Sequence, residues 1–170
     1  YVEAYNDCGT ITSDTWVFYT QTGPDGITLS SPADSTDGIP AGDITLVWNE
    51  PTSGSSPFTY DVYVNGVAIA TGLTSTSYDM TVACDDTIDW FVVAYNICGE
   101  DTSEIWNFTT QTSPYGISLI YPPDDSAGII PGDLELVWSS PESGDPPFTY
   151  SLYIDGSLFA DGLTDTTYHI

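Results

Sequence analysis

The 170-residue sequence contains no lysine and no arginine, against 25 aspartate and glutamate residues, so its formal net charge is −25. A chain without basic side chains has nothing to displace the counterions of a phosphate backbone, which excludes nucleic acid as a ligand. Lysine and arginine salt bridges are excluded too, so each carboxylate must be solvated, hydrogen-bonded or matched by a cation from solution. Repulsion on this scale destabilises the folded state and is relieved by salt. We expect a surface adapted to an extracellular environment.

Few residues of the chain could carry catalysis. There is one histidine, His169, and there are three cysteines and no lysine. Most aspartates stand in turn-like segments, where their short side chains bond the local backbone. The residue counts do not exclude a catalytic pair of carboxylates like that of glycosidases. We therefore predict a protein that is not an enzyme and that needs no organic cofactor. The apolar runs span only a few residues each, so no membrane-spanning helix is predicted.

What the sequence does contain is an internal repeat of 90 residues. Five pairs show this offset: Cys8 and Cys98, Trp16 and Trp106, Trp48 and Trp138, Tyr60 and Tyr150, Tyr78 and Tyr168. The repeat divides the chain into 1–22, the end of one copy, 23–112, a complete copy, and 113–170, the start of a third. The partial copies would each expose half a core and an unpaired strand edge. The simplest explanation is a window cut from a longer repeat protein. If the ends are the protein's own, 113–170 would accept 1–22 of another chain and build a fibre by strand complementation.

Within the complete copy, short alternating segments separated by turn residues predict an all-β sandwich. The predicted strands are 26–31, 43–48, 58–64, 67–71, 76–82, 88–96 and 104–110. Asn65-Gly66 is a strong signal for a two-residue hairpin. The alternation predicts which side chains point into the core: Ile44, Leu46, Trp48, Tyr60, Val62, Val64, Trp90, Val92, Ala94, Trp106 and Phe108.

Four motifs of this copy carry a family resemblance: LVWNEP (46–51), YDVYVNG (60–66), GLTSTSY (72–78) and WFVVAYNICGEDTS (90–103). In this order they resemble a fibronectin type III domain, and the resemblance extends over both partial copies. It implies tandem seven-stranded immunoglobulin-like sandwiches, similar to the modules of large bacterial surface proteins. A fold does not fix a function. The first interpretation is a structural segment of an extracellular filament, stalk or adhesin shaft, whose partners are copies of itself. The alternative is a carbohydrate- or receptor-binding module.

In such a sandwich the turns that hold Cys84 and Cys98 lie at opposite poles. About nine strand residues at about 3.3 Å each separate them by about 30 Å, whereas a disulfide needs Cα atoms within about 7 Å. When modules stack head to tail, however, the two kinds of turn face each other across each junction. We therefore predict that Cys84 bonds the counterpart of Cys98 in the following copy. Cys8 and Cys98 would each bond a counterpart of Cys84 in the copy before theirs. Free thiols are the alternative.

Two sets of turn aspartates gather at the same pole of the predicted sandwich. Calcium takes six to eight oxygen ligands, and carboxylates at a junction could supply several of them. The sequence has no loop of the Asp-x-Asp-x-Asp-Gly type, and solvated turn aspartates are the alternative. The calcium candidates are Asp34, Asp37, Asp85 and Asp86.

The outward face of the strand predicted over 88–96 is apolar where a solvated strand would alternate with polar residues. Exposed apolar stripes usually mark an interface, so this face predicts lateral contact between copies or a platform for a glycan or receptor. Cover by the domain's own loops is the alternative. The outward residues are Tyr63, Phe91, Val93 and Tyr95, with Tyr1 and Tyr5 in the first copy. Asn107 begins the sequon Asn-Phe-Thr and is a glycosylation candidate.

Overall fold

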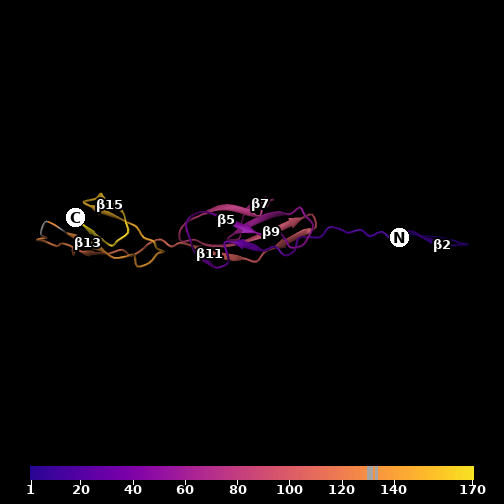
Figure 1. The fold of residues 1–170 in the computed structure, drawn as a ribbon, viewed down its shortest axis with the longest axis horizontal. Coiled ribbons are helices and arrows are strands. Elements are labelled where there is room, and N and C mark those ends of the chain that lie inside the picture. The colour runs from indigo at the N-terminus through magenta and orange to yellow at the C-terminus, as the bar shows by residue number, and fades with distance from the viewer. Residues whose placement is uncertain (130–131, 133) are drawn as a thin grey trace.

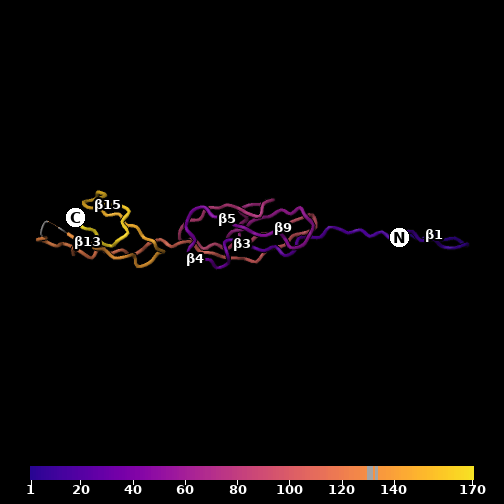
Figure 2. Tube along the Cα trace, in the orientation of Figure 1, coloured from indigo at the N-terminus to yellow at the C-terminus, as the bar shows by residue number. Residues whose placement is uncertain are grey.

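The structure, a computed structural model, describes residues 1–129, 132 and 134–170. They form three groups of strands in one extended row (Figure 1). A hairpin stands at the N-terminal end, a two-sheet sandwich in the middle and a smaller group of strands at the C-terminal end (Figure 2). All regular elements of the described residues are strands, as predicted. Among these residues there is no helix long and apolar enough to cross a membrane.

The first sheet of the sandwich has three antiparallel strands in the order β3-β5-β8. Leu29 of β3 pairs with Trp48 of β5, and Leu46 of β5 pairs with Tyr78 of β8. Side chains alternate between the two faces of a strand, so Leu46 and Trp48 both enter the core. The three strands are β3 (Leu29–Ser31), β5 (Gly42–Trp48) and β8 (Ser77–Val82).

The second sheet has the order β4-β11-β9-β6-β7, and β10 pairs with the far half of β9. Its central strand β9 is the longest of the chain and contacts three neighbours. Strand β4 runs parallel to β11, while the other pairs are antiparallel. The strands are β4 (Thr36–Ile39), β6 (Thr59–Val64), β7 (Val67–Leu73), β9 (Thr87–Asn96), β10 (Gly99–Thr102) and β11 (Trp106–Thr110).

The core lies between these two sheets and is built around aromatic pairs. Trp48 meets Tyr60 edge-to-face at a centroid distance of 5.6 Å, and Trp90 meets Trp106 at 6.4 Å. Such T-shaped contacts add to the gain from burial alone. All predicted inward side chains are confirmed: Leu46, Trp48, Tyr60, Val62, Val64, Trp90, Val92, Ala94 and Phe108 are buried, and Ile44 and Trp106 pack against them half-buried.

Two strands escaped the sequence prediction. Residues 36–39, expected as a turn, form β4 because the backbone on either side of it bonds β11: Ser35 N–H donates to the Asn107 carbonyl and Gln111 N–H to the Ile39 carbonyl. The strand predicted over 104–110 begins at Trp106 instead, and residues 99–102 form β10. The pairing of β4 with β11 joins residues about 70 positions apart, which no local pattern encodes, whereas β10 pairs with β9 across the adjacent hairpin turn.

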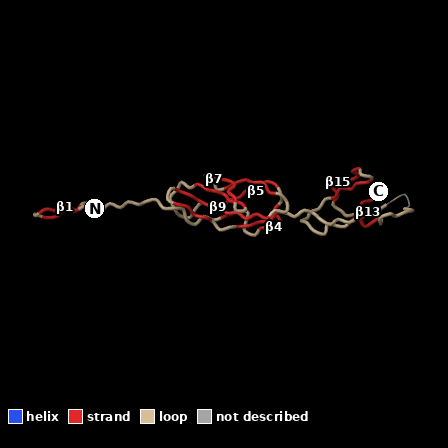
Figure 3. The backbone as a smooth tube through the Cα atoms, turned by 180° about the vertical axis from the view of Figure 1, so that it is seen from behind, coloured by secondary structure: helices blue, strands red, loops and turns tan. Residues whose placement is uncertain are grey.

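Among the described residues, the C-terminal group contains five strands in two sheets, and Figure 3 draws its strands in red. Its pairings repeat those found 90 residues earlier: Leu119 lies opposite Trp138 as Leu29 lies opposite Trp48. The first sheet has the order β12-β13-β16, and β14 pairs with β15. The strands are β12 (Leu119–Tyr121), β13 (Glu135–Trp138), β14 (Tyr150–Ile154), β15 (Ser157–Leu163) and β16 (Thr167–His169).

The N-terminal hairpin consists of β1 (Glu3–Asn6) and β2 (Gly9–Thr12). Residues 13–22 carry no strand, although residues 106–110 at the equivalent positions form β11. The reason is that β11 pairs with β4 and with residues 87–90 of β9. Neither partner has a counterpart beside residues 13–22, and an extended segment without a partner forms no ladder.

Candidate interaction sites

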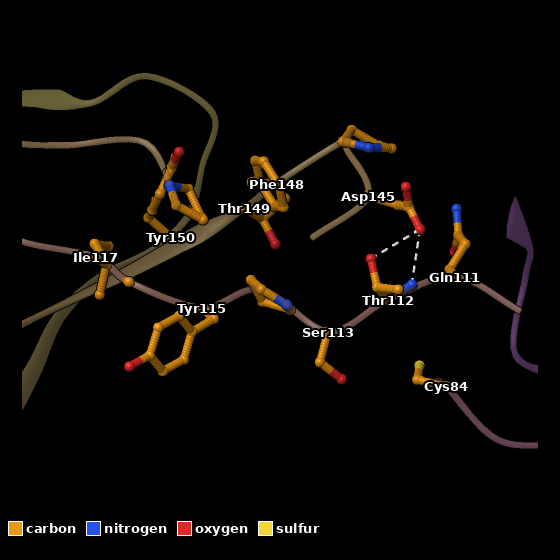
Figure 4. Close-up of a pocket in the computed structure, with 14 residues that line it drawn as sticks. Cys84, Gln111, Thr112, Ser113, Tyr115, Ile117, Asp145, Phe148, Thr149 and Tyr150 are labelled. Atoms are coloured by element: carbon orange, nitrogen blue, oxygen red, sulfur yellow. Dashed lines mark hydrogen bonds between the residues drawn. The ribbon is translucent and has the colours of Figure 1, made fainter. Parts of the chain in front are cut away.

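The junction between the sandwich and the C-terminal group is held from both sides. We define the linker as residues 111–113. Asp85, in the turn between β8 and β9, accepts hydrogen bonds from Ser113 N–H at 3.0 Å and from Ser113 Oγ at 2.6 Å. Its own N–H donates to the Gln111 carbonyl at 3.0 Å. From the other side, Asp145 accepts from Thr112 N–H at 2.7 Å and from Thr112 Oγ1 at 3.1 Å, as Figure 4 shows. The linker is thus bonded to both of the units that it joins.

These contacts favour the ionised form of the Asp85 carboxylate. The hydrogen bonds from the Ser113 hydroxyl, and next from the Ser113 backbone, hold the pKa of Asp85 below its usual value of 3.8. Hydrogen bonds to a carboxylate favour the ionised form. Asp85, predicted as a calcium candidate, therefore binds the linker, a role that sequence reasoning missed. Asp145, its partner in holding the linker, was not predicted because it lies 33 residues from Thr112.

A cavity of about 410 Å³ lies beside the linker. Cys84 lines it on the side of the sandwich, and Tyr115, Phe148 and Tyr150 line it on the side of the C-terminal group (Figure 4). Cys84 therefore lies at the junction, as predicted from the position of its turn.

The same contact occurs at the N-terminal pole of the sandwich. Ser55, the counterpart of Asp145, donates its N–H to the Thr22 carbonyl at 3.1 Å, and its Oγ accepts from Thr22 N–H. Asn96 adds two bonds from its side-chain amide, to the Thr22 carbonyl at 2.8 Å and to the Ser55 carbonyl at 2.9 Å. The Cys98 carbonyl lies 3.8 Å from the point where a Cβ on Gly23 would stand. The hairpin turn that holds Cys98 thus abuts the start of its own module.

The three cysteines are exposed and form no disulfide with one another in the described chain. Their predicted partners belong to other copies, so the pairing stays a prediction. Cys8 and Cys98 occupy the same kind of turn: the N–H of each donates to the side-chain oxygen of the asparagine two residues before it, Asn6 Oδ1 and Asn96 Oδ1, at 2.8 Å.

The remaining calcium candidates bond protein groups. Asp34 accepts from Asn107 N–H at 3.0 Å, Asp37 from Thr109 Oγ1, and Asp86 from Ala83 N–H at 3.0 Å. Within residues 1–129, 132 and 134–170, no three side chains of His, Cys, Asp or Glu converge as metal ligands would. The structure thus gathers these aspartates near one pole but gives each a separate local role.

The predicted outward stripe forms a compact aromatic patch on β6 and β9. Tyr63 and Phe91 stack in parallel at 4.7 Å, and both are half-buried. Val93 is buried although it does not belong to the core cluster, since β6 and β10 flank it. Burial and then the neighbouring Tyr63 raise the pKa of Tyr95 above its usual value. The counterparts in the first copy are exposed: Tyr1, which precedes β1, and Tyr5, which lies on β1.

The Asn107 side chain is exposed on β11, where the sequon prediction requires it to be. The one histidine, His169, is exposed too, with Nε2 3.8 Å from Glu135 Oε1.

The strand order decides the type of sandwich. Strands β3-β5-β8 face β11-β9-β6-β7, the two-sheet arrangement of immunoglobulin-like domains with antiparallel strands and a buried tryptophan. The fold is a fibronectin type III-like β-sandwich. No protein-family model and no curated protein matches the chain.

Two solved structures are similar to this type III-like fold. The fibronectin(III)-like modules of Clostridium thermocellum CbhA are 13% identical, with 85% of this chain and 77% of that chain covered and a TM-score of 0.45. The PKD domain of the human VPS10 domain-containing receptor SorCS2 is 17% identical, with 62% of this chain and 88% of that chain covered and a TM-score of 0.45. Both likenesses concern the fold alone.

Proposed function

We propose that this chain is a structural segment of an extracellular filament, stalk or adhesin shaft. In this proposal, type III-like modules stack head to tail, and disulfides between modules reinforce the junctions. The observation that carries it is the linker, which Asp85 binds from one module and Asp145 from the next. A linker held on both sides transmits orientation from module to module, unlike a free Gly/Ser linker.

The contact at Thr22 and Ser55 supports a repeating junction. It stands 90 residues before the contact of Thr112 with Asp145 and uses the same backbone groups. Units that contact only their neighbours form a quasi-one-dimensional rod. A segment of such a rod needs neither a catalytic group nor a cofactor.

The composition supports a location outside the cell. A net charge of −25 without any basic residue suits a surface in a salty medium. The absence of lysine and arginine also leaves no cleavage site for proteases that require them.

The aromatic patch supports a second candidate function, the binding of a carbohydrate or a surface receptor. Tyr63 and Phe91 present a stacked pair of rings beside Tyr95. Binding of the monomeric chain to a glycan array, lost in Phe91→Ser, would favour this function over the rod.

The proposal of a rod is tested by measuring the distribution of distances between two spin labels, one on each side of the junction. Spin labels are placed at the exposed residues Thr71 and Ser157 through cysteine substitutions, with the three native cysteines replaced by serine. Labelled chains are diluted into unlabelled chains, so that one distance is measured within one molecule. We expect a narrow distribution that broadens in the double variant Asp85→Ala with Asp145→Ala.

Asp79→Ala is the matched control, because it removes one charge and an Oδ–hydroxyl bond of 2.6 Å to Thr45, away from the junction. It should leave the distribution narrow. A broad distribution in the chain with an intact linker, or no response to the double variant, would refute the rod.

A further inference from the structure

We propose that the aromatic patch binds arginine side chains of a basic partner protein. The patch consists of Tyr63 on β6 with Phe91 and Tyr95 on β9, and all three are half-buried on the outer face of the second sheet. This proposal goes beyond the rod. It rests on the second candidate function, binding at this patch, and names the chemistry of the partner. All residues that it needs lie within the complete module.

One face of the Tyr63 ring is covered and the other is open. The rings of Tyr63 and Phe91 lie at an interplanar angle of 4° with centroids 4.7 Å apart, and the two residues are opposite each other on neighbouring strands. This separation matches the usual spacing of strands, about 4.7–4.9 Å, so the rings stand side by side across the strands. On its other side, Tyr63 lies opposite Ala68 of β7, an exposed residue. A single methyl group is too short to cover a ring.

The open face of Tyr63 looks toward the edge of the sheet. Strand β7 ends the order β4-β11-β9-β6-β7 and pairs with β6 alone among the described residues. A ligand can therefore approach the ring from this edge without displacing a strand. The face of an aromatic ring carries the negative part of its quadrupole and attracts cations. The ring thus favours a positively charged group that can lie flat against it.

A carboxylate lies at the same edge. Asp61 precedes Tyr63 by two positions on β6, so both side chains point to the outer face. Asp61 Oδ1 accepts a hydrogen bond from Gly72 N–H of β7 at 2.8 Å, which turns the carboxylate toward β7, the side on which the Tyr63 ring is open. Asp61 Oδ2 accepts no hydrogen bond from the described residues. It is an acceptor available to a ligand beside the open ring face.

The surroundings of Tyr95 show that aromatic and acidic side chains meet in this patch. Burial and then Tyr63 raise the pKa of Tyr95 above its usual value. The negative charges of Asp61 and Glu100 raise it further. Glu100 lies opposite Tyr95 on β10, where it is exposed. Two carboxylates therefore flank the three rings.

The chain has no cation of its own to place on the patch. It contains neither lysine nor arginine, so no such side chain can pair with the carboxylates or stack on the rings. A second copy is a poor occupant for the same reason, since it would bring a charge of −25 to a surface that is already negative. Charge complementarity therefore requires a basic partner.

Arginine fits the patch better than lysine does. A guanidinium is planar, stacks on aromatic faces and donates paired N–H groups to a carboxylate, whereas an ammonium is a compact, strongly hydrated charge. Residues two positions apart on a strand are separated by about 6.6 Å. A guanidinium on the Tyr63 ring can therefore turn its N–H edge to Asp61. A neutral sugar would use the rings but leave the carboxylates without a cation.

The aromatic positions of the patch recur in the neighbouring copies. Tyr153 stands 90 positions after Tyr63, and Tyr1 and Tyr5 stand 90 positions before the two rings of β9. Repeated sites on one chain raise the overall affinity for a partner with several arginines. Asp61 has Ser151 at its equivalent position, so we assign arginine binding to the complete module alone.

The first experiment is isothermal titration calorimetry of the reduced full chain with three peptides of equal length. In these peptides arginine, lysine or citrulline alternates with glycine, and citrulline keeps the planar shape of arginine without its charge. Sodium chloride at about 0.15 M limits long-range attraction to about 8 Å. We expect the arginine peptide to bind at least about threefold more tightly than the lysine peptide. The citrulline peptide should not bind. Equal affinities of the arginine and lysine peptides would overturn the proposal.

Substitutions of Tyr63 test the role of the ring. Tyr63→Leu keeps an apolar side chain but removes the ring, so it should weaken binding of the arginine peptide at least about threefold. Tyr63→Phe keeps the ring and should bind as the parent chain does. Circular dichroism shows whether each variant is folded. If the Leu and Phe variants are folded and bind equally well, the ring does not hold the cation and the proposal is wrong.

A substitution of Asp61 tests the carboxylate and does not depend on folding of the Tyr63 variants. Asp61→Asn keeps an oxygen for Gly72 N–H but removes the charge, and it should weaken binding of the arginine peptide at least about threefold. Asp79→Asn is the matched control, because it removes the same charge from an aspartate that bonds Thr45 at 2.6 Å on the other sheet. It should bind as the parent chain does. Equal losses in both variants would mean that only the net charge matters, which would overturn the proposal.

The outcomes separate this inference from the functions proposed above. A glycan that binds the parent chain but not Phe91→Ser, without any preference for arginine over lysine peptides, would keep the patch as a binding site and refute arginine as its ligand. Arginine binding that Tyr63→Leu abolishes, together with a broad spin-label distance distribution at the junction, would support the inference and refute the rod.

Discussion

The pair Phe108 and Phe18 provides the most informative stability prediction, because one residue type occupies one repeat position in two environments. Phe108 on β11 is fully buried between β9 and β4, and Phe18 extends into solvent. Phe108→Ala removes most of a buried ring and leaves a cavity, which costs about 3–5 kcal/mol. For a domain whose total stability is about 5–15 kcal/mol, this is a large fraction. Phe18→Ala should cost the monomer nothing measurable.

The assay measures thermal unfolding of the complete module. Unfolding is monitored by tryptophan fluorescence and circular dichroism, in dilute samples that contain a reductant. With a shift of about 4–8 °C per kcal/mol for a domain of this size, Phe108→Ala should lower the Tm by at least about 12 °C. Phe18→Ala should unfold together with the parent chain. Dilution matters, because any association between chains would add stability by mass action.

Two results would refute this reasoning. If Phe108→Ala costs less than about 1 kcal/mol, β11 does not close the core as described. If Phe18→Ala destabilises the chain as much as Phe108→Ala does, Phe18 packs within the chain, contrary to its exposure of 86%.

Two further predictions concern charge. Because hydrogen bonds from Ser113 lower the pKa of Asp85 in the folded state, its contribution to the junction is complete above pH 3.8 and is lost as the pH falls from there through the lowered pKa. The spin-label distance distribution should therefore broaden once the pH falls below the lowered pKa, and a distribution that stays narrow when Asp85 is fully protonated would contradict its role. Sodium chloride should raise the Tm by screening the charge of −25. Calcium chloride at equal ionic strength should add nothing, because Asp34, Asp37, Asp85 and Asp86 accept protein hydrogen bonds; a further rise would indicate a specific calcium site.

Most of the sandwich could be predicted from local sequence. Alternation placed Leu46, Trp48 and Phe108 on the inner face, because side chains along a strand alternate whatever the strand pairs with. Asn65-Gly66 predicted its hairpin for the same local reason. Strand β4 could not be predicted, because its pairing with β11 joins residues about 70 positions apart.

The candidate sites, too, divide into features that the sequence predicted and features that depend on tertiary contacts. The positions of Cys84 and Cys98 at opposite poles follow from the order of strands, so the sequence located them. The bonds of Asp85 to Ser113 and of Asp145 to Thr112 depend on how two modules meet, and no spacing in the sequence encodes that meeting. The sequence singled out Asp85 as a calcium candidate, and the structure places its carboxylate on the linker.

By itself, the sequence determined the 90-residue period, the β-strands and the face of each strand that is apolar. Only the tertiary structure decided which of those faces are covered. Phe18 and Phe108 share a residue type and a repeat position, yet one lies in water and the other in the core. The reason is physical: alternation is a property of a single strand, whereas burial requires partner strands, which for Phe108 include β4, about 70 positions away in the sequence.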